Sequence, residues 1–72
     1  MVKITIKTEF ILLGQFLKYA GIVSTGGQIK WFLSENEVKI NGITEQRRGK
    51  KVFLGDVVEV LGKKYLIDSD EI

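Results

Sequence analysis

The side chains best suited to chemistry are the bases of one short stretch, Arg47-Arg48-Gly49-Lys50-Lys51. Four of its five positions are basic, and no acid stands inside the stretch. Positive groups at this density suit a polyanion, and the arginine fork matches pairs of phosphate oxygens. The alternative is a solvated turn that keeps a small sheet soluble. The density of charge favours contact with a nucleic acid.

A second candidate site is the pair Gly26-Gly27, at the expected start of a helix. Backbone N–H groups at a helix start point outward beside the positive end of the helix dipole, which makes a generic anion site. The pair is not followed by the Lys-Ser/Thr of a nucleotide-binding loop. The glycines could instead serve only to permit a tight turn between two helices. Both interpretations stay open at the level of sequence.

Enzyme chemistry is not expected from this composition. The chain has no histidine and no cysteine, which removes the usual base for a serine nucleophile, thiolate chemistry, disulfides and the usual zinc sites. Asp68, Asp70 and Glu71 superficially resemble a magnesium site, but we expect residues 68–72 to form a frayed acidic tail. We therefore expect no catalysis, no cofactor and no small-molecule substrate.

Trp31 is the aromatic residue considered for stacking on a base. Trp31 stands beside an apolar helical stripe rather than on it, and a tryptophan at the edge of a small core is commoner than one that stacks on a base. Tyr19 and Tyr65 are also expected at the edge of the core.

The length and the charge describe one small basic domain. The 72 residues carry 11 bases and 9 acids, and this length suits a single domain over 1–72. Three of those acids lie in 68–72, so residues 1–67 hold eleven bases against six acids, a net charge of +5. The start of the chain alternates without a signal-like apolar block, and the run 10–13 is too short to span a bilayer. We expect a cytoplasmic protein that does not contact a membrane.

Two short helices are expected to position these side chains. The first has apolar residues with helical spacing at Leu13, Phe16, Leu17 and Ala20. Gly21 follows as a C-terminal cap. The second begins with Thr25 and Gln28 in a capping-box pattern. Its apolar face consists of Ile29, Phe32 and Leu33.

Strands are expected on both sides of the helices. Residues 2–7 alternate strictly, and short apolar stretches follow at 38–40, 52–54, 58–60 and 65–67. Turn signals separate them at Asn41-Gly42, Gly55-Asp56 and Gly62-Lys63. The first strand needs a partner and is expected to join the C-terminal hairpin. The predicted fold class is α+β, with two short helices packed on a small, mainly antiparallel sheet.

The segment from Leu12 to Val60 resembles the alpha-L RNA-binding domain, the module named after the fourth protein of the small ribosomal subunit. Residues 38–42 read Val-Lys-Ile-Asn-Gly, and 52–60 read Val-Phe-Leu-Gly-Asp-Val-Val-Glu-Val, which match the second half of the family pattern. The first half matches more loosely. Leu12, Gly14 and Gly26 stand where the family usually has Arg, Asp and Arg. The chain is most similar to the small stand-alone members called YaaA-like or YbcJ-like.

The resemblance implies non-catalytic binding of structured ribosomal or transfer RNA, with a role in ribosome assembly or translation in a bacterium. The contact set that it implies is Gln15, Lys18, Thr25, Lys30, Arg47, Arg48, Lys50 and Lys51. The anion-site argument adds Gly26 and Gly27. A protein-interaction adaptor is the main alternative, with the basic stretch serving solubility. Binding to DNA also stays open, because electrostatic attraction does not distinguish the two sugars. A sulfur-carrier-like protein is set aside, because the sequence ends in Asp70-Glu71-Ile72 rather than Gly-Gly.

Overall fold

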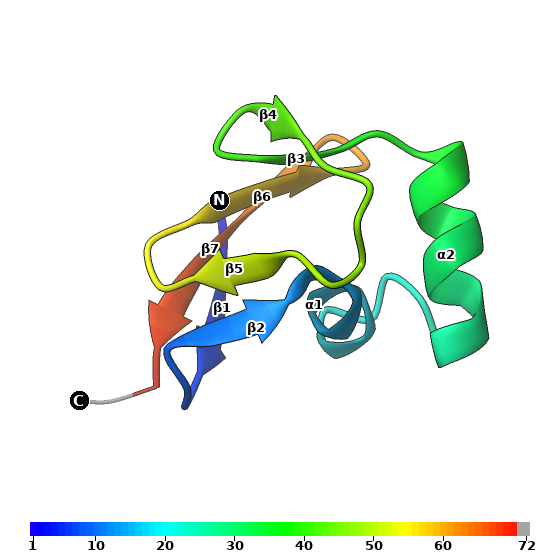
Figure 1. The fold of residues 1–72 in the computed structure, drawn as a ribbon. Helices are drawn as coiled ribbons and strands as arrows, with labels where there is room; N and C mark the ends of the chain where they lie inside the picture. The colour runs from blue at the N-terminus through cyan, green and yellow to red at the C-terminus, as the bar shows by residue number, and fades with distance from the viewer. Residues whose placement is uncertain (71–72) are drawn as a thin grey trace.

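The computed structural model of the chain describes residues 1–70. Seven strands and two helices follow one another as β1 (Val2–Ile6), β2 (Phe10–Leu12), α1 (Leu13–Tyr19), α2 (Gly26–Glu35), β3 (Val38–Ile40), β4 (Ile43–Thr44), β5 (Lys51–Phe53), β6 (Val57–Val60) and β7 (Lys63–Ser69). Figure 1 shows the strands on one side of the molecule and α2 on the other.

The strands form a five-stranded sheet and a separate two-stranded ribbon. The sheet has the order β1-β7-β6-β3-β4, and only β1 and β7 run parallel. β2 and β5 pair antiparallel to form the ribbon. The predicted α+β class with a mainly antiparallel sheet is confirmed. The first strand also joins the C-terminal hairpin, as predicted.

A polar clamp ties the β3–β4 turn to the turn that precedes β6. Asn41 and Gly42 have φ of 51° and 83°, which is the pair of left-handed conformations that a type I′ hairpin turn needs. The Asn41 side chain donates to Asp56 Oδ1 at 3.0 Å and accepts the Val57 N–H at 2.9 Å. The other oxygen of Asp56 accepts the Phe53 N–H at 2.8 Å. The clamp therefore also fixes the end of β5.

The end of α1 and the start of α2 match the signals predicted from the sequence. Gly21 has φ of 76°, and its N–H donates to the Lys18 carbonyl at 3.0 Å. At the start of α2 the Gln28 side chain reaches back, as predicted. Its Oε1 accepts the N–H groups of Ser24 at 2.7 Å and Thr25 at 3.1 Å.

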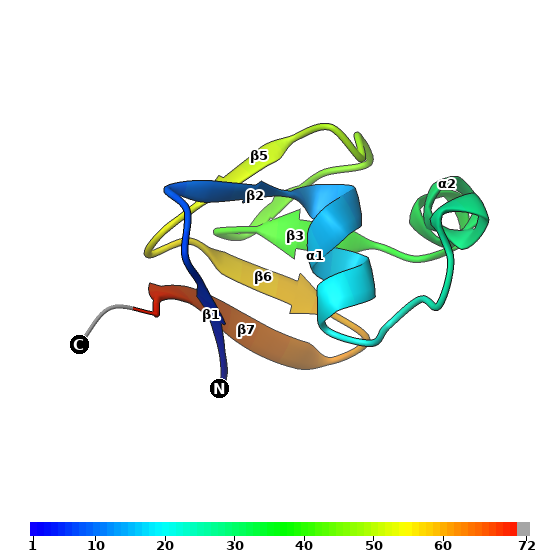
Figure 2. The same cartoon turned by 90° about the horizontal axis from the view of Figure 1, so that it is seen from below.

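One hydrophobic core joins the helices to the sheet. α1 packs against the sheet, and α2 lies beside α1 (Figure 2). Phe16 of α1 meets Tyr65 of β7 edge-on, with ring centroids 5.4 Å apart. Each helix buries its predicted apolar stripe, namely Leu13, Phe16 and Leu17 in α1 and Ile29, Phe32 and Leu33 in α2. Ala20, the last residue of the predicted stripe of the first helix, is instead the C-cap of α1 and is only partly buried.

The expectation of a frayed acidic tail is wrong for the residues that the structure describes. β7 continues to Ser69, and the Asp70 N–H donates to the Ile6 carbonyl at 2.9 Å. Asp68 lies 3.7 Å from the ammonium of Lys3, and a second pair joins Asp70 to Lys7 at 3.9 Å. Pairing with β1 holds this segment, and that pairing is not visible in the local sequence. Positions 71 and 72 of the expected tail lie outside the described residues.

The expected places of two aromatic side chains are also wrong. Trp31 is 65% exposed and Tyr19 is 62% exposed, so neither closes the core. The Tyr19 hydroxyl donates to the Thr5 carbonyl at 3.1 Å. Tyr65 is buried, close to its predicted position.

Candidate nucleic-acid interface

The basic loop, residues 45–50 between β4 and β5, is attached to the start of α1. The Leu13 N–H donates to the Lys50 carbonyl at 2.8 Å, and the Gly14 N–H donates to the Arg48 carbonyl at 2.9 Å. The first N–H groups of a helix have no partner within the helix, and here loop carbonyls accept two of them. The loop backbone is therefore fixed while its basic side chains remain exposed.

Gly14 lies where α1, α2 and the basic loop meet. A Cβ at this position would lie 3.2 Å from the Ile29 side chain and 3.3 Å from Arg48 Cβ. Only a residue without a side chain allows this approach without displacement. Ile29 belongs to the first turn of α2, so the contact brings the basic loop against that turn.

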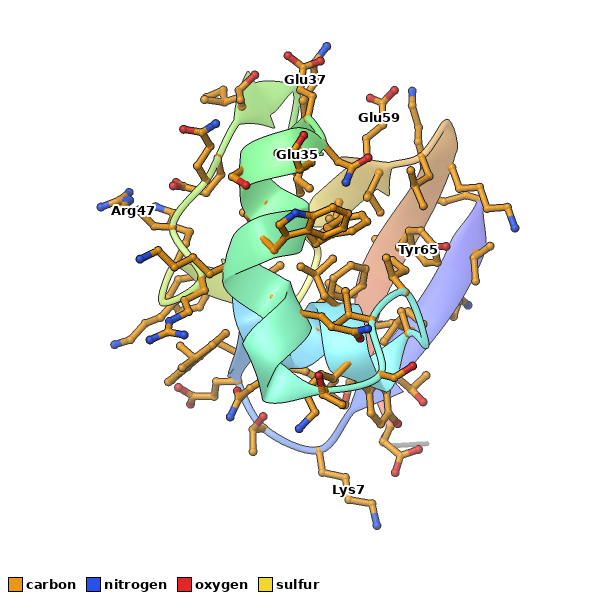
Figure 3. All side chains as sticks on the ribbon, turned by 90° about the vertical axis from the view of Figure 1, so that its right-hand side faces the viewer. Lys7, Glu35, Glu37, Arg47, Glu59 and Tyr65 are labelled. Atoms are coloured by element: carbon orange, nitrogen blue, oxygen red, sulfur yellow. The ribbon has the colours of Figure 1, made fainter. Side chains whose placement is uncertain are left out.

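Two lysines border the same contact. Lys18 follows Gly14 by one helical turn and shares its side of α1. On α2, the side chains of Lys30 and Gln28 point to opposite sides of the helix face that carries Ile29. Figure 3 shows the basic loop along one flank of α2 and the α1–α2 connection along the other. Because Gln28 bonds to the α1–α2 connection, Lys30 lies on the flank of the basic loop.

Arg47 differs from the other bases because Glu45 holds it. Its Nε lies 3.0 Å from one carboxylate oxygen of Glu45, and Nη2 lies 3.1 Å from the other. The hydrogen bond from the Arg47 side chain, followed by that from its backbone N–H, lowers the pKa of Glu45 to about 2. An acid two residues before the basic stretch thus offsets the charge of Arg47. Counting acids only inside the stretch missed it.

The remaining bases of the stretch have no such partner. Within residues 1–70, Arg48, Lys50 and Lys51 have no carboxylate within ion-pair distance. The ammonium of Lys51 lies 4.8 Å from the centre of the Phe10 ring, a cation–π contact. Three cations of the stretch are therefore available to an anionic ligand.

Thr25, Gly26 and Gly27 leave the start of α2 open. Neither glycine has a left-handed φ, and a Cβ on Gly26 would meet nothing within 4 Å. The tight turn between the helices depends on Gly21 instead, since its φ is 76°. The left-handed conformation of that turn therefore comes from Gly21 and not from the glycine pair. Gly26 and Gly27 are both exposed, whereas the Gln28 N–H of the same turn donates to the Thr25 carbonyl at 3.2 Å.

Gln15 is not brought to the basic loop. Its Oε1 accepts the Leu12 N–H at 3.1 Å, so the side chain caps its own helix. Gln15 and Lys18 also line a hollow of about 720 Å³ beside the β1–β2 connection, together with Tyr19. Lys18 borders both this hollow and the basic face, whereas Gln15 faces only the hollow and the start of α1.

Acidic side chains gather elsewhere. Figure 3 shows Glu35, Glu37 and Glu59 at the end of the molecule where α2 finishes, and Arg47 on the flank of the basic loop. Glu37 also pairs with Lys39 at 3.7 Å. Glu45 is the acid of the basic loop and is paired with Arg47, so the other charged side chains around the Gly14 contact are basic. A surface of this charge raises the local concentration of polyanions.

No three His, Cys, Asp or Glu side chains within residues 1–70 gather closely enough to hold a metal ion. No helix in the same part of the chain is long and apolar enough to cross a membrane.

Comparisons with known proteins agree with the resemblance drawn from the sequence. The model of a family described as the S4 domain matches residues 4–68. A Bacillus subtilis (strain 168) protein named "Probable ribosome maturation protein RlbA" is 56% identical over 59 residues, which cover 82% of this chain and 83% of that protein.

Proposed function

The chain belongs to the S4 domain family, and we propose that it binds structured RNA, without catalysis, through the face around Gly14. One observation carries this proposal. Arg48 of the basic loop lies beside the first turn of α2, since a Cβ on Gly14 would be within 3.3 Å of both elements. Lys18 and Lys30 border the same contact. Lys50 and Lys51 extend the face along the loop into β5.

The proposed ligand is ribosomal RNA during ribosome maturation in the cytoplasm of a bacterium. The name of the Bacillus subtilis relative supports this ligand over transfer RNA. The face presents cations at the ends of long side chains and, at Gly26 and Gly27, bare backbone N–H groups. Such groups recognise the phosphate lines and the shape of an RNA helix or junction rather than base edges.

The test compares two charge-matched double variants. Arg48→Gln with Lys50→Gln removes two unpaired cations from the proposed face. The affinity for a ribosomal RNA fragment should fall, and the slope of log K against log salt should become shallower by about 1.4–1.8. Lys3→Gln with Lys7→Gln removes the same charge from bases that Asp68 and Asp70 already pair.

The control pair should leave the salt slope near the wild-type value. Thermal melts of both variants verify that each remains folded. Equal slopes in the two double variants would contradict the proposed face. A wild-type affinity that does not respond to salt would contradict RNA binding through phosphates.

The exposure of Trp31 favours a second candidate function, a protein-interaction adaptor. Its side chain is 65% exposed and borders a small hollow with Ile22 and Val23, on the flank away from the basic loop. Exposed tryptophans are enriched in the centres of protein interfaces. An adaptor would retain a protein partner after nuclease treatment and in high salt, and Trp31→Ala would abolish that retention.

A further inference from the structure

The β2–β5 ribbon carries two phenylalanines that the core does not use. Val52 is fully buried, so the alternation of β5 turns Lys51 and Phe53 to the outer face. Phe10 of β2 stands directly opposite Phe53 in the register. Phe53 is 48% exposed. An aromatic side chain at this exposure contributes little to the core and remains accessible to a ligand.

The Phe53 ring lies beside cations on the ribbon. Its centroid is 5.7 Å from that of Phe10, with the planes tilted by 53°. The Lys51 ammonium lies over the Phe10 ring, 4.8 Å from its centroid, so one face of that ring is covered. A hollow of about 490 Å³ next to Phe53 is lined otherwise by Arg47, Gly49, Lys50 and Lys51, with no acid.

Hydrogen bonds to the backbone hold both ends of this segment in place. The Phe53 N–H is bound by Asp56 at 2.8 Å, and the Lys50 carbonyl accepts from Leu13 at 2.8 Å. The aromatic ring and its neighbouring ammonium groups are therefore attached to a fixed backbone. A ligand that used them would not have to order the loop first, which lowers the cost of binding.

We propose that the outer face of the β2–β5 ribbon binds an unpaired RNA nucleotide, whose base stacks on Phe53 and whose phosphates contact Lys50 and Lys51. This inference rests on the proposed function and adds a preference for RNA with unpaired nucleotides. A nucleotide combines a flat aromatic ring with adjacent negative charge, and the hollow offers the matching combination. An apolar protein segment would instead have to desolvate several cations there.

The test uses two blunt-ended RNA duplexes of the same sequence, one fully paired and one with a single bulged adenosine. The ratio of their affinities cancels most of the phosphate contribution common to both. Removal of a stacking side chain costs about 5- to 150-fold in affinity. We therefore expect Phe53→Leu to reduce the preference of the wild type for the bulged duplex by at least about fivefold. Binding to the paired duplex should be unchanged, and Phe53→Tyr should retain the preference.

Trp31→Leu is the matched control, because it removes another exposed aromatic ring on the far flank of α2. It should keep the wild-type ratio. A wild type without preference, or a Phe53→Leu variant with the wild-type ratio, would overturn the stacking proposal while leaving RNA binding intact. An equal loss for both duplexes would also overturn it, since only the basic loop would then have been disturbed. Failure of the wild type to bind either duplex would instead refute the proposed function itself.

Discussion

Glu45→Gln should strengthen RNA binding, because Glu45 restrains a cation of the basic loop. Its two oxygens accept from Nε and Nη2 of Arg47 at 3.0 and 3.1 Å. The neutral amide no longer offsets the guanidinium charge, so Arg47 can turn toward a phosphate. The substitution also removes one negative charge from the rim of the proposed face.

Two contributions set the expected gain. A carboxylate about 8 Å from a bound phosphate costs about 0.5 kcal/mol in water, so its removal alone gives about a twofold gain. A released Arg47 that contacts one further phosphate makes the log–log salt slope steeper by about 0.7–0.9. Together these effects predict an affinity gain of about two- to tenfold near 0.1 M salt.

Fluorescence anisotropy of a labelled RNA hairpin over a series of salt concentrations measures both quantities. Glu59→Gln makes the same change in charge near the end of the molecule where α2 finishes, on the side away from Arg47 in Figure 3. It should alter the affinity less than twofold, since the Debye length at 0.1 M is about 10 Å. A Glu45→Gln variant that binds no more tightly than Glu59→Gln would refute the restraining role of Glu45. Weaker binding would show that the Glu45–Arg47 pair itself shapes the binding surface.

Two further predictions concern stability. The pKa of Glu45 is lowered from 4.5 to about 2, so the stabilisation from its pair with Arg47 is present above pH 4.5 and is lost as the pH falls toward 2. Melting temperatures between pH 5 and pH 2 should therefore drop more steeply for the wild type than for Glu45→Gln, and parallel curves would contradict the pairing. Gly14→Ala places a Cβ 3.2–3.4 Å from Ile29 and Arg48, and overpacking outweighs the gain in helix propensity, for a net loss of about 1 kcal/mol. The melting temperature of Gly14→Ala should fall and its RNA affinity should weaken. Gly26→Ala is the control, because a Cβ there would meet nothing within 4 Å, and it should melt no lower than the wild type. A Gly14→Ala melting temperature above that of the wild type would contradict the close packing.

Local sequence signals predicted most turns and helix ends of this protein. The last turn is an exception, since it lies at Leu61-Gly62, with φ of 52° and 76°, rather than at the predicted Gly62-Lys63, and Lys63 already belongs to β7. Asn41-Gly42 requires two left-handed residues in a row, and few residue pairs other than Asn-Gly adopt them easily. Gly21 and Gln28 likewise act within one helical turn of the ends that they cap. Turns and helix caps depend on interactions between residues only a few positions apart, so they can be predicted from the local sequence.

Pairings between distant segments could not be predicted in the same way. The strand 10–12 exists because it pairs with 51–53, and neither segment is long enough to show alternation. The segment 63–69 extends to Ser69 because β1 pairs in parallel with its residues 65–69. Local composition favoured a frayed end there, since three acids within five residues indicate a solvated tail.

The sequence predicted which bases lie in the candidate site but not how their side chains are arranged. The cluster of bases indicated the loop, but the bidentate pair of Arg47 with Glu45 depends on a chain bend that brings positions two apart into contact. The exposure of Phe53 was not predicted, because Phe53 stands inside an apolar stretch and was counted with the strand. Its exposure follows from the pairing of β5 with β2, and only the alternation around Lys51 could have indicated it.

The motif that carries the family resemblance mainly builds the scaffold. The side chains of Asn41 and Asp56 form hydrogen bonds with each other and with backbone N–H groups. Gly55 has φ of 89°, and its N–H donates to the Ile67 carbonyl at 2.8 Å. None of these groups points to a free polyanion site. We therefore expect the choice of ligand to depend on side chains that the motif does not specify, such as Arg48 and Phe53. Members with the same scaffold can differ in ligand, because exposed positions on the loop and the ribbon can change without disturbing the clamp that holds them.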